Sequence, residues 1–154
     1  MPKDTRPPQE ILEHVIASRI ALASVIYGLS EEQLTAAGVV GRWSVKDLLA
    51  HMGKWEQVCL TELQKHVRGE EPGGNYRDAL WYNDQWEAEL RALSLLESIA
   101  LFETAHARLL LFLSKLGEEQ WDGYVRAWVS GSTWHHFEEH GAEIRAWREY
   151  PAVP

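Results

Sequence analysis

The chain has 154 residues, 45% of them hydrophobic and eight of them tryptophan, which is enough apolar material for one packed domain spanning residues 1–154. Its formal net charge of −8 argues against the phosphate backbone of a nucleic acid as a partner. The only cysteine, Cys59, cannot form an internal disulfide, and no stretch has the roughly 18 apolar residues of a membrane span, so we expect a cytoplasmic protein with no signal peptide and no membrane partner.

Apolar residues recur with a helical period along nearly the whole chain, which predicts an all-α fold. Ser44 and Asp47 form a predicted capping box at the start of the second helix, and Ser94 and Glu97 form another at the start of the third. The segment 69–75, which is rich in glycine, interrupts the pattern after the second helix and is followed by a short crossover helix. The expected helices span residues 8–27, 44–69, 76–90, 94–116 and 133–150.

A weak internal repeat relates the two halves of the chain. Residues 29–34 (LSEEQL) follow the first helix much as residues 116–121 (LGEEQW) follow the third, and a histidine-bearing helix comes after each. Two helix–turn–helix units joined by a longer crossover predict a four-helix bundle in which the second and fourth helices occupy equivalent places. Equivalent places imply that these two helices lie side by side and run in the same direction.

Three histidines stand where an apolar helical face would carry leucine. His136 and His140 are four residues apart, so both imidazoles lie on one side of the last helix, one turn apart. His51 and His140 each come seven residues after an expected N-cap, Ser44 and Thr133. At roughly 1.5 Å per residue, both rings lie about 10 Å from their helix starts. Parallel neighbouring helices would therefore bring the three rings together.

Three histidines from two helices predict an open metal site, because catalytic zinc sites use three protein ligands and leave one position for water or substrate. The helix N-terminus is also expected to favour the neutral form of His136, which is the form that binds a metal. The alternative is a set of core histidines satisfied by hydrogen bonds, but each unpaired buried nitrogen would cost roughly 1–3 kcal/mol. We therefore take His51, His136 and His140 as candidate ligands of a divalent ion.

Other polar residues near this set have two interpretations each. His106 lies on the apolar stripe of the third helix, where it either packs in the core or faces the site. Glu139 and Glu143 each follow a candidate ligand by three residues, and either accept a ring proton from a histidine of a neighbouring helix or are solvated. The H-x-x-E-H pattern ending at His140 also matches inverzincin proteases, with Glu139 as the base, but it leaves His51 unexplained. Four tryptophans are expected either as walls of a site for a small organic substrate or as core: Trp43, Trp55, Trp134 and Trp147.

The chain resembles the DinB-like superfamily of four-helix bundles, and within it the ClbS/DfsB group. The resemblance rests on residues 43–51 (WSVKDLLAH), on Trp55, and on residues 136–147 (HFEEHGAEIRAW), and it spans nearly the whole chain. Members of the superfamily bind a divalent metal, zinc or nickel, through one histidine on the second helix and an H-x-x-x-H pair on the fourth. The resemblance thus implies the same three ligands and the same fold, a DinB-like bundle with a longer crossover between its second and third helices.

The resemblance also implies a range of activities. Related proteins include transferases and isomerases that use a low-molecular-weight thiol, and the ClbS branch includes a protein that protects against a genotoxic metabolite. An arginine soon after the last ligand histidine is usual in the thiol transferases, whereas Gly141 follows His140 here, which speaks against thiol transfer. We expect a homodimeric, metal-dependent transferase or hydrolase acting on a small electrophile or thiol adduct. The alternatives are a ClbS-type protein that sequesters a small molecule without reaction, and a plain dimerising helical module.

Overall fold

The structure, a computed structural model, describes residues 3–150, and within that range the chain is helical without a β-strand, apart from one isolated bridge between Val40 and Trp43. The predicted all-α fold is confirmed. The elements are α1 (Pro8–Ile26), α2 (Glu31–Thr35), α3 (Val45–Val67), α4 (Ala79–Arg91), α5 (Leu95–Ser114), the 3-10 helix η1 (Glu118–Gln120), α6 (Gly123–Ser132) and α7 (Trp134–Glu149).

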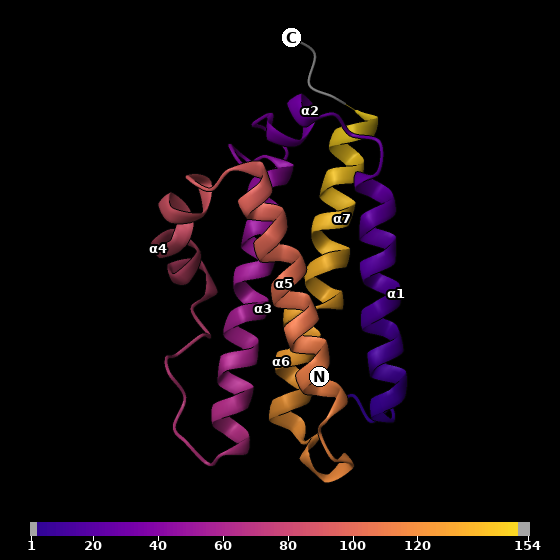
Figure 1. Cartoon of the computed structure of the whole chain (residues 1–154), viewed down its shortest axis with the longest axis vertical. Coiled ribbons are helices and arrows are strands. Elements are labelled where there is room, and N and C mark those ends of the chain that lie inside the picture. Colours follow the sequence, from indigo (N-terminus) through magenta and orange to yellow (C-terminus); the bar gives the residue numbers. More distant parts are fainter. Residues whose placement is uncertain (1–2, 151–154) are drawn as a thin grey trace.

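The long helices α1, α3 and α5 form a bundle with a fourth rod made of α6 and α7 placed end to end (Figure 1). The short helix α4 lies outside α3, and with the segment that precedes it forms the crossover between α3 and α5. The predicted four-helix bundle with a longer crossover between its second and third helices is therefore confirmed.

The expected direction of the fourth helix is wrong. α3 runs away from the end of the bundle where α2 lies, whereas α7 runs toward that end (Figure 1). The crossover explains the difference: it returns the chain to the end at which α3 began, so α5 starts there and runs parallel to α3. The turn after α5 then sends α6 and α7 back, parallel to α1 and antiparallel to α3.

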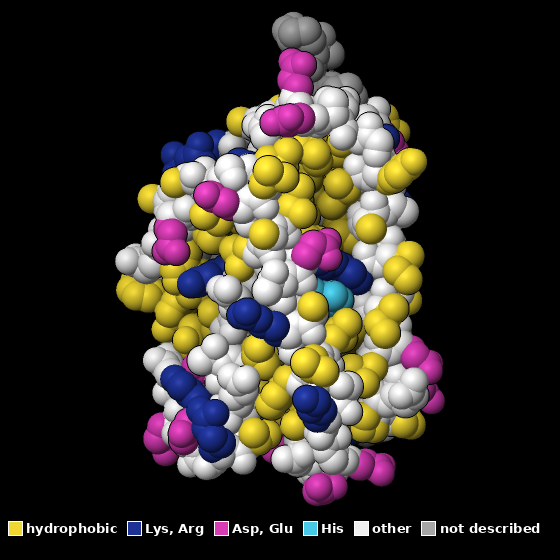
Figure 2. Space-filling model, viewed as in Figure 1, with side chains coloured by type: hydrophobic (Ala, Val, Ile, Leu, Met, Phe, Trp, Pro, Cys, Tyr) yellow, Lys and Arg dark blue, Asp and Glu magenta, His cyan; other side chains and the backbone are white. Residues whose placement is uncertain are grey.

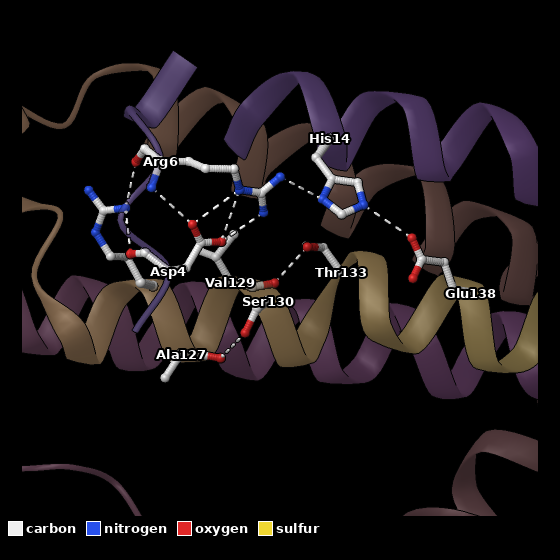
Figure 3. Close-up of polar contacts among 9 residues, drawn as sticks. Asp4, Arg6, His14, Ala127, Val129, Ser130, Thr133 and Glu138 are labelled. Carbon is white, nitrogen blue, oxygen red and sulfur yellow. Dashed lines mark hydrogen bonds and ion pairs between the residues drawn. The ribbon is translucent and has the colours of Figure 1, made fainter. Parts of the chain in front are cut away.

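α6 was not predicted, and Thr133, which occupies the N-cap position of α7, makes no capping hydrogen bond with its side chain. α6 starts after Asp122, whose carboxylate accepts a hydrogen bond from the Val125 N–H at 3.0 Å. At Thr133 the backbone leaves the helical region (φ −117°, ψ −101°), and the hydroxyl donates to the Val129 carbonyl at 2.6 Å instead of capping α7 (Figure 3). The helix that bears His136 and His140 is thus the second half of a longer, interrupted rod.

The two repeat segments form short helices at equivalent turns. Residues 29–34 contain α2, which has a complete capping box at Ser30. Residues 116–121 contain η1, where the side chain of Gln120 accepts a hydrogen bond from the Gly117 N–H at 2.8 Å. Each turn reverses the chain between two long helices, so the repeat marks the corners of the bundle.

The N-terminal segment fastens α1 to the fourth rod. The guanidinium of Arg126 donates to the backbone carbonyls of Asp4 and Arg6 at 3.1 and 2.8 Å. His14 lies 3.1 Å from both a guanidinium nitrogen of Arg6 and a carboxylate oxygen of Glu138 (Figure 3). These contacts pair α1 with α7 along one side of the bundle.

The core consists of two clusters of buried apolar side chains. One cluster contains Ile11 and Val15 of α1 together with residues from the last parts of α3 and α5 and from α6. The other contains Leu22 and Val25 of α1 with residues from the first parts of α3 and α5 and from α7. Gly53 allows α3 and α5 to approach closely, since a Cβ atom there would lie 3.0 Å from the backbone of the opposite helix. Within residues 3–150 no helix is both long and apolar enough to cross a bilayer.

Candidate metal site

His51, His136 and His140 come together in the structure. Nε2 of His51 lies 2.9 Å from Nε2 of His136. The ring centroid of His140 lies 5.2 Å from that of His51 and 4.6 Å from that of His136. One nitrogen of each ring lies within 4.8 Å of the others, a spacing that one metal ion can bridge.

The three rings meet for a different reason from the one expected. His51 follows the capping box of Ser44 and Asp47, which fixes the start of α3 as predicted. His140 lies nine residues before the end of α7 at Glu149, and that end of α7 is at the same end of the bundle as the start of α3. His51 and His140 lie at a similar depth in the bundle because His51 is seven residues after the N-cap of α3 and His140 is nine residues before the end of α7.

Burial keeps two of the rings neutral. Burial, followed by the nearby ring of His140, lowers the pKa of His51 to about 3. Burial, followed by the rings of His51 and His140, lowers the pKa of His136 well below its usual value. Burial is thus the largest cause of the lowered pKa of His136. Neutral imidazole is the form that can donate a lone pair to a metal.

A carboxylate orients one of the three rings. Oε2 of Glu143 lies 2.6 Å from Nδ1 of His140, which leaves Nε2 of that ring for a metal. The partner of Glu143 is thus a histidine of its own helix, which differs from both interpretations given above, a histidine of a neighbouring helix and a solvated carboxylate. Nδ1 of His136 is buried and has no hydrogen-bond partner among residues 3–150, and Nε2 is the nitrogen of this ring that faces His51. Three convergent imidazole nitrogens are a donor set that suits zinc or nickel.

A cavity of about 920 Å³ opens on the three histidines and extends between α3, the segment before α4, and both parts of the fourth rod. Glu139 and Glu143 of α7 also line it. Its aromatic lining consists of Trp43, Trp55, Tyr76, Tyr124 and Trp128. A cavity of this size accommodates a small organic molecule.

The sequence identified only part of this lining. Trp43 and Trp55 border the cavity as expected, but Trp134 and Trp147 do not. Trp134 packs in one apolar cluster and stacks on His14, with ring centroids 4.7 Å apart, and Trp147 packs against the other cluster. The missed residues Tyr124 and Trp128 belong to α6; extending the helical period back from His136 would have placed Trp128, eight residues earlier, on the same face.

His106 does not line the cavity. Its Nδ1 lies 2.8 Å from Oε2 of Glu56, and both side chains are buried in the core. Of its two interpretations, the core histidine is therefore the correct one. Glu139 is an exposed residue at the edge of the cavity, which agrees with a solvated carboxylate.

Comparisons with known proteins place these features in a family. The sequence profile of the DinB superfamily matches residues 14–144. The structure titled "Sibling Lethal Factor Precursor - DfsB" is 18% identical, with a TM-score of 0.80 over 98% of this chain and 100% of that chain. The colibactin self-resistance protein ClbS is 9% identical, with a TM-score of 0.79 over 95% and 98%. An uncharacterised protein from Escherichia coli UTI89 is 14% identical, with a TM-score of 0.78 over 96% of both chains. No curated protein sequence matches the chain at a significant level.

At these identities the likeness to solved structures shows the fold alone. The ClbS structure is a complex with double-stranded DNA, so a protein of this fold contacts nucleic acid. That finding runs against the expectation, drawn from charge, that nucleic acid is no partner. For the present chain, with a net charge of −8, the absence of a nucleic-acid partner stays a prediction.

Proposed function

The chain belongs to the DinB superfamily, and on this basis we propose that it is a metal-dependent enzyme whose centre is formed by His51, His136 and His140 around one divalent ion, zinc or nickel. The substrate is a small electrophile or a thiol adduct, and the reaction is of the transferase or hydrolase type. A low-molecular-weight thiol is the candidate second substrate, and the cytoplasm is the expected location.

One observation carries this proposal: three convergent imidazoles, two of them kept neutral by burial, stand at the wall of a large cavity. A structural metal site is closed by four protein ligands, whereas a catalytic site keeps a position open toward substrate. Among residues 3–150, three candidate ligands are brought together, and the cavity provides access to the remaining position.

The residues around the histidines have separate tasks. Glu143 contacts Nδ1 of His140 and thereby leaves Nε2 of that ring to bind the ion. The indole of Trp43 packs against His51, with ring centroids 4.9 Å apart, and limits the rotation of that ring. When bound, the ion would supply Lewis-acid activation of a water or thiol nucleophile near neutral pH.

The proposal is tested by elemental analysis of protein purified without added metal. We expect about one zinc or nickel ion per chain, and we expect His136→Ala to lower the metal affinity by about 10-fold or more. The matched control is His135→Ala, because His135 is the adjacent residue, is exposed and does not line the cavity. A wild-type protein that holds no stoichiometric metal, and whose melting temperature ignores added zinc and nickel, would contradict the metal centre.

A second candidate is a protein that sequesters a toxic small molecule without changing it. The aromatic cavity favours this function, and ClbS, which shares the fold, is titled a self-resistance protein. The two functions differ in what is recovered after incubation with a bound electrophile. Mass spectrometry that finds a converted molecule supports the enzyme, whereas quantitative recovery of the unchanged molecule supports sequestration.

A further inference from the structure

We propose that the part of the cavity lined by Trp55, Tyr76 and Trp128 is a subsite for a planar aromatic group of the substrate. The inference rests on the proposed function, because it takes the histidines as the reacting end of the same cavity. It adds the class of molecule that the cavity selects: one that carries an aromatic ring system at a distance from its reacting group.

The walls of this subsite are aromatic rings from three separate parts of the chain. Trp55 belongs to α3, Trp128 belongs to α6, and Tyr76 lies in the segment between α3 and α4. The ring of Tyr76 stands nearly perpendicular to both indoles, at 77° to Trp55 and 72° to Trp128, with centroids 6.1 and 5.3 Å apart. Tyr76 therefore packs edge to face on both indoles, and the three rings form one continuous aromatic wall of the cavity.

Trp55 can contact a ligand through its ring but not through its N–H, which already donates a hydrogen bond within the protein. Its Nε1 donates to Oδ1 of Asn83 at 2.9 Å, so this polar group is already satisfied within the protein. A ligand that meets a satisfied indole gains from stacking and from burial of apolar surface. Such a wall favours a planar ring over an aliphatic group of the same carbon skeleton.

A buried carboxylate holds the wall in place. Glu62 of α3 is only 1% exposed, and its two oxygens accept the N–H of Gly73 at 3.1 and 2.9 Å. Gly73 precedes Tyr76 by three residues, so this contact anchors the segment that carries the tyrosine. Burial, followed by the charge of Glu62, raises the pKa of Tyr76. The subsite is therefore formed before a ligand arrives.

The fourth rod connects the subsite with the histidines. Trp128 precedes His136 by eight residues, roughly 12 Å of helix. Gly131 lies between them on the cavity wall, and a Cβ atom added there would meet nothing within 4 Å. The missing side chain leaves room for a molecule that reaches from the histidines to the rings.

The subsite is tested with prodan, a neutral planar naphthalene dye whose emission changes on leaving water, added to the full chain. Gly131→Leu fills the passage and is expected to weaken prodan binding by about 10-fold or more, in line with the loss of aromatic contacts. The matched control is Gly123→Leu, because Gly123 also lies in α6 with open space at its Cβ but does not line the cavity. Trp128→Leu should weaken binding as well.

Competition measures the preference for planar rings. We expect 2-naphthol to displace prodan at a concentration about 10-fold lower than decahydro-2-naphthol, which has the same skeleton without planarity. Displacement by both at equal concentrations, or binding that survives both Gly131→Leu and Trp128→Leu in folded protein, would overturn the subsite. His136→Ala should leave prodan binding within about twofold, since eight residues of the fourth rod separate His136 from Trp128. Wild-type protein that binds prodan but holds no stoichiometric metal would therefore contradict only the proposed metal centre, and wild-type protein that holds the metal but does not bind prodan would contradict only the subsite.

Discussion

Nδ1 of His106 lies 2.8 Å from Oε2 of Glu56 in the interior of the bundle. Arg19 completes the group, because its guanidinium lies 3.2 Å from the other oxygen of Glu56 and 3.3 Å from the ring centre of Phe102. The three polar residues come from α1, α3 and α5 and lie along these helices between the members of the two apolar clusters. A charged layer therefore separates the two halves of the core.

Glu56→Ala should strongly destabilise the protein. The change leaves Arg19 and His106 buried without their shared carboxylate, which is expected to lower the free energy of unfolding by about 3 kcal/mol or more. Urea denaturation followed by circular dichroism measures the effect. The control is Glu103→Ala: Glu103 lies 3.5 Å from the same guanidinium but is 67% exposed, so its loss should cost less than about 1 kcal/mol. Equal effects of the two variants would show that the buried layer contributes no more than a surface ion pair.

Gly53→Ala and Gly131→Ala should change stability in opposite directions. At Gly53 the new methyl group would lie 3.0 Å from the backbone of Phe102, so α3 and α5 must separate, and the free energy of unfolding should fall by about 1–3 kcal/mol. At Gly131 the methyl group meets nothing, and the better helix propensity of alanine should add up to about 1 kcal/mol. Thermal unfolding of both variants beside the wild type checks this, and destabilisation by Gly131→Ala would contradict the open space.

Glu62→Ala should loosen the segment before α4. Loss of the buried carboxylate removes the acceptor of the Gly73 N–H, so hydrogen exchange of that amide and its neighbours should accelerate by about 10-fold or more. Glu70→Ala is the control, because Glu70 is in the same region but is exposed, and its carboxylate pairs with Arg68. Exchange mass spectrometry resolves the peptide, and unchanged rates in Glu62→Ala would show that other contacts hold the segment.

The metal-free protein should lose stability as the pH falls. Burial and then the ring of His140 lower the pKa of His51 to about 3 in the folded chain, whereas an unfolded histidine titrates near 6.5. Between these values the unfolded chain binds a proton that the folded chain does not, so the free energy of unfolding is highest above pH 6.5 and falls toward pH 3. Urea titrations in chelator at several pH values measure the slope. His51→Gln should reduce it and His135→Gln should not; an unchanged slope in His51→Gln would place the titration elsewhere.

We also predict a homodimer, from the family resemblance and from the number of aromatic residues. Figure 2 shows hydrophobic side chains gathered along the seam between α5 and α1 on the face in view. Ile20 of α1 and Leu96 of α5 are 65% and 79% exposed, which is apolar surface that a second copy would cover. Light scattering across micromolar concentrations gives the mass directly. A monomeric mass throughout the range would remove the dimer from this account.

The sequence predicted the elements better than their directions. The i, i+4 spacing of His136 and His140 and the capping box before His51 are local patterns, and the structure retains both. Helix direction depends on where the crossover returns the chain, which no local pattern encodes. The three rings still meet, although α7 runs opposite to the expected direction, because His140 lies near the middle of α7 and is at a similar distance from either end of that helix.

The sequence did not predict that Tyr76 and Trp128 line the cavity, for a different reason. Residues 130–132 (SGS) resemble a loop, so the helix that carries Trp128 was not expected before Thr133. Tyr76 reaches the cavity because Gly73 is held by Glu62, a partner eleven residues earlier in the chain. Such contacts follow from tertiary packing rather than from periodicity.

The interruption at Thr133 divides the fourth rod into two parts that contribute different residues to the cavity. α7 bears His136 and His140, whereas α6 contributes Tyr124, Trp128 and the open passage at Gly131. Thr133 joins the two parts: its N–H and its hydroxyl both donate to the carbonyl of Val129 in α6, and its own carbonyl accepts the N–H of Phe137 in α7. A change of Trp128 or Gly131 in α6 therefore alters the lining of the cavity without replacing a histidine of α7.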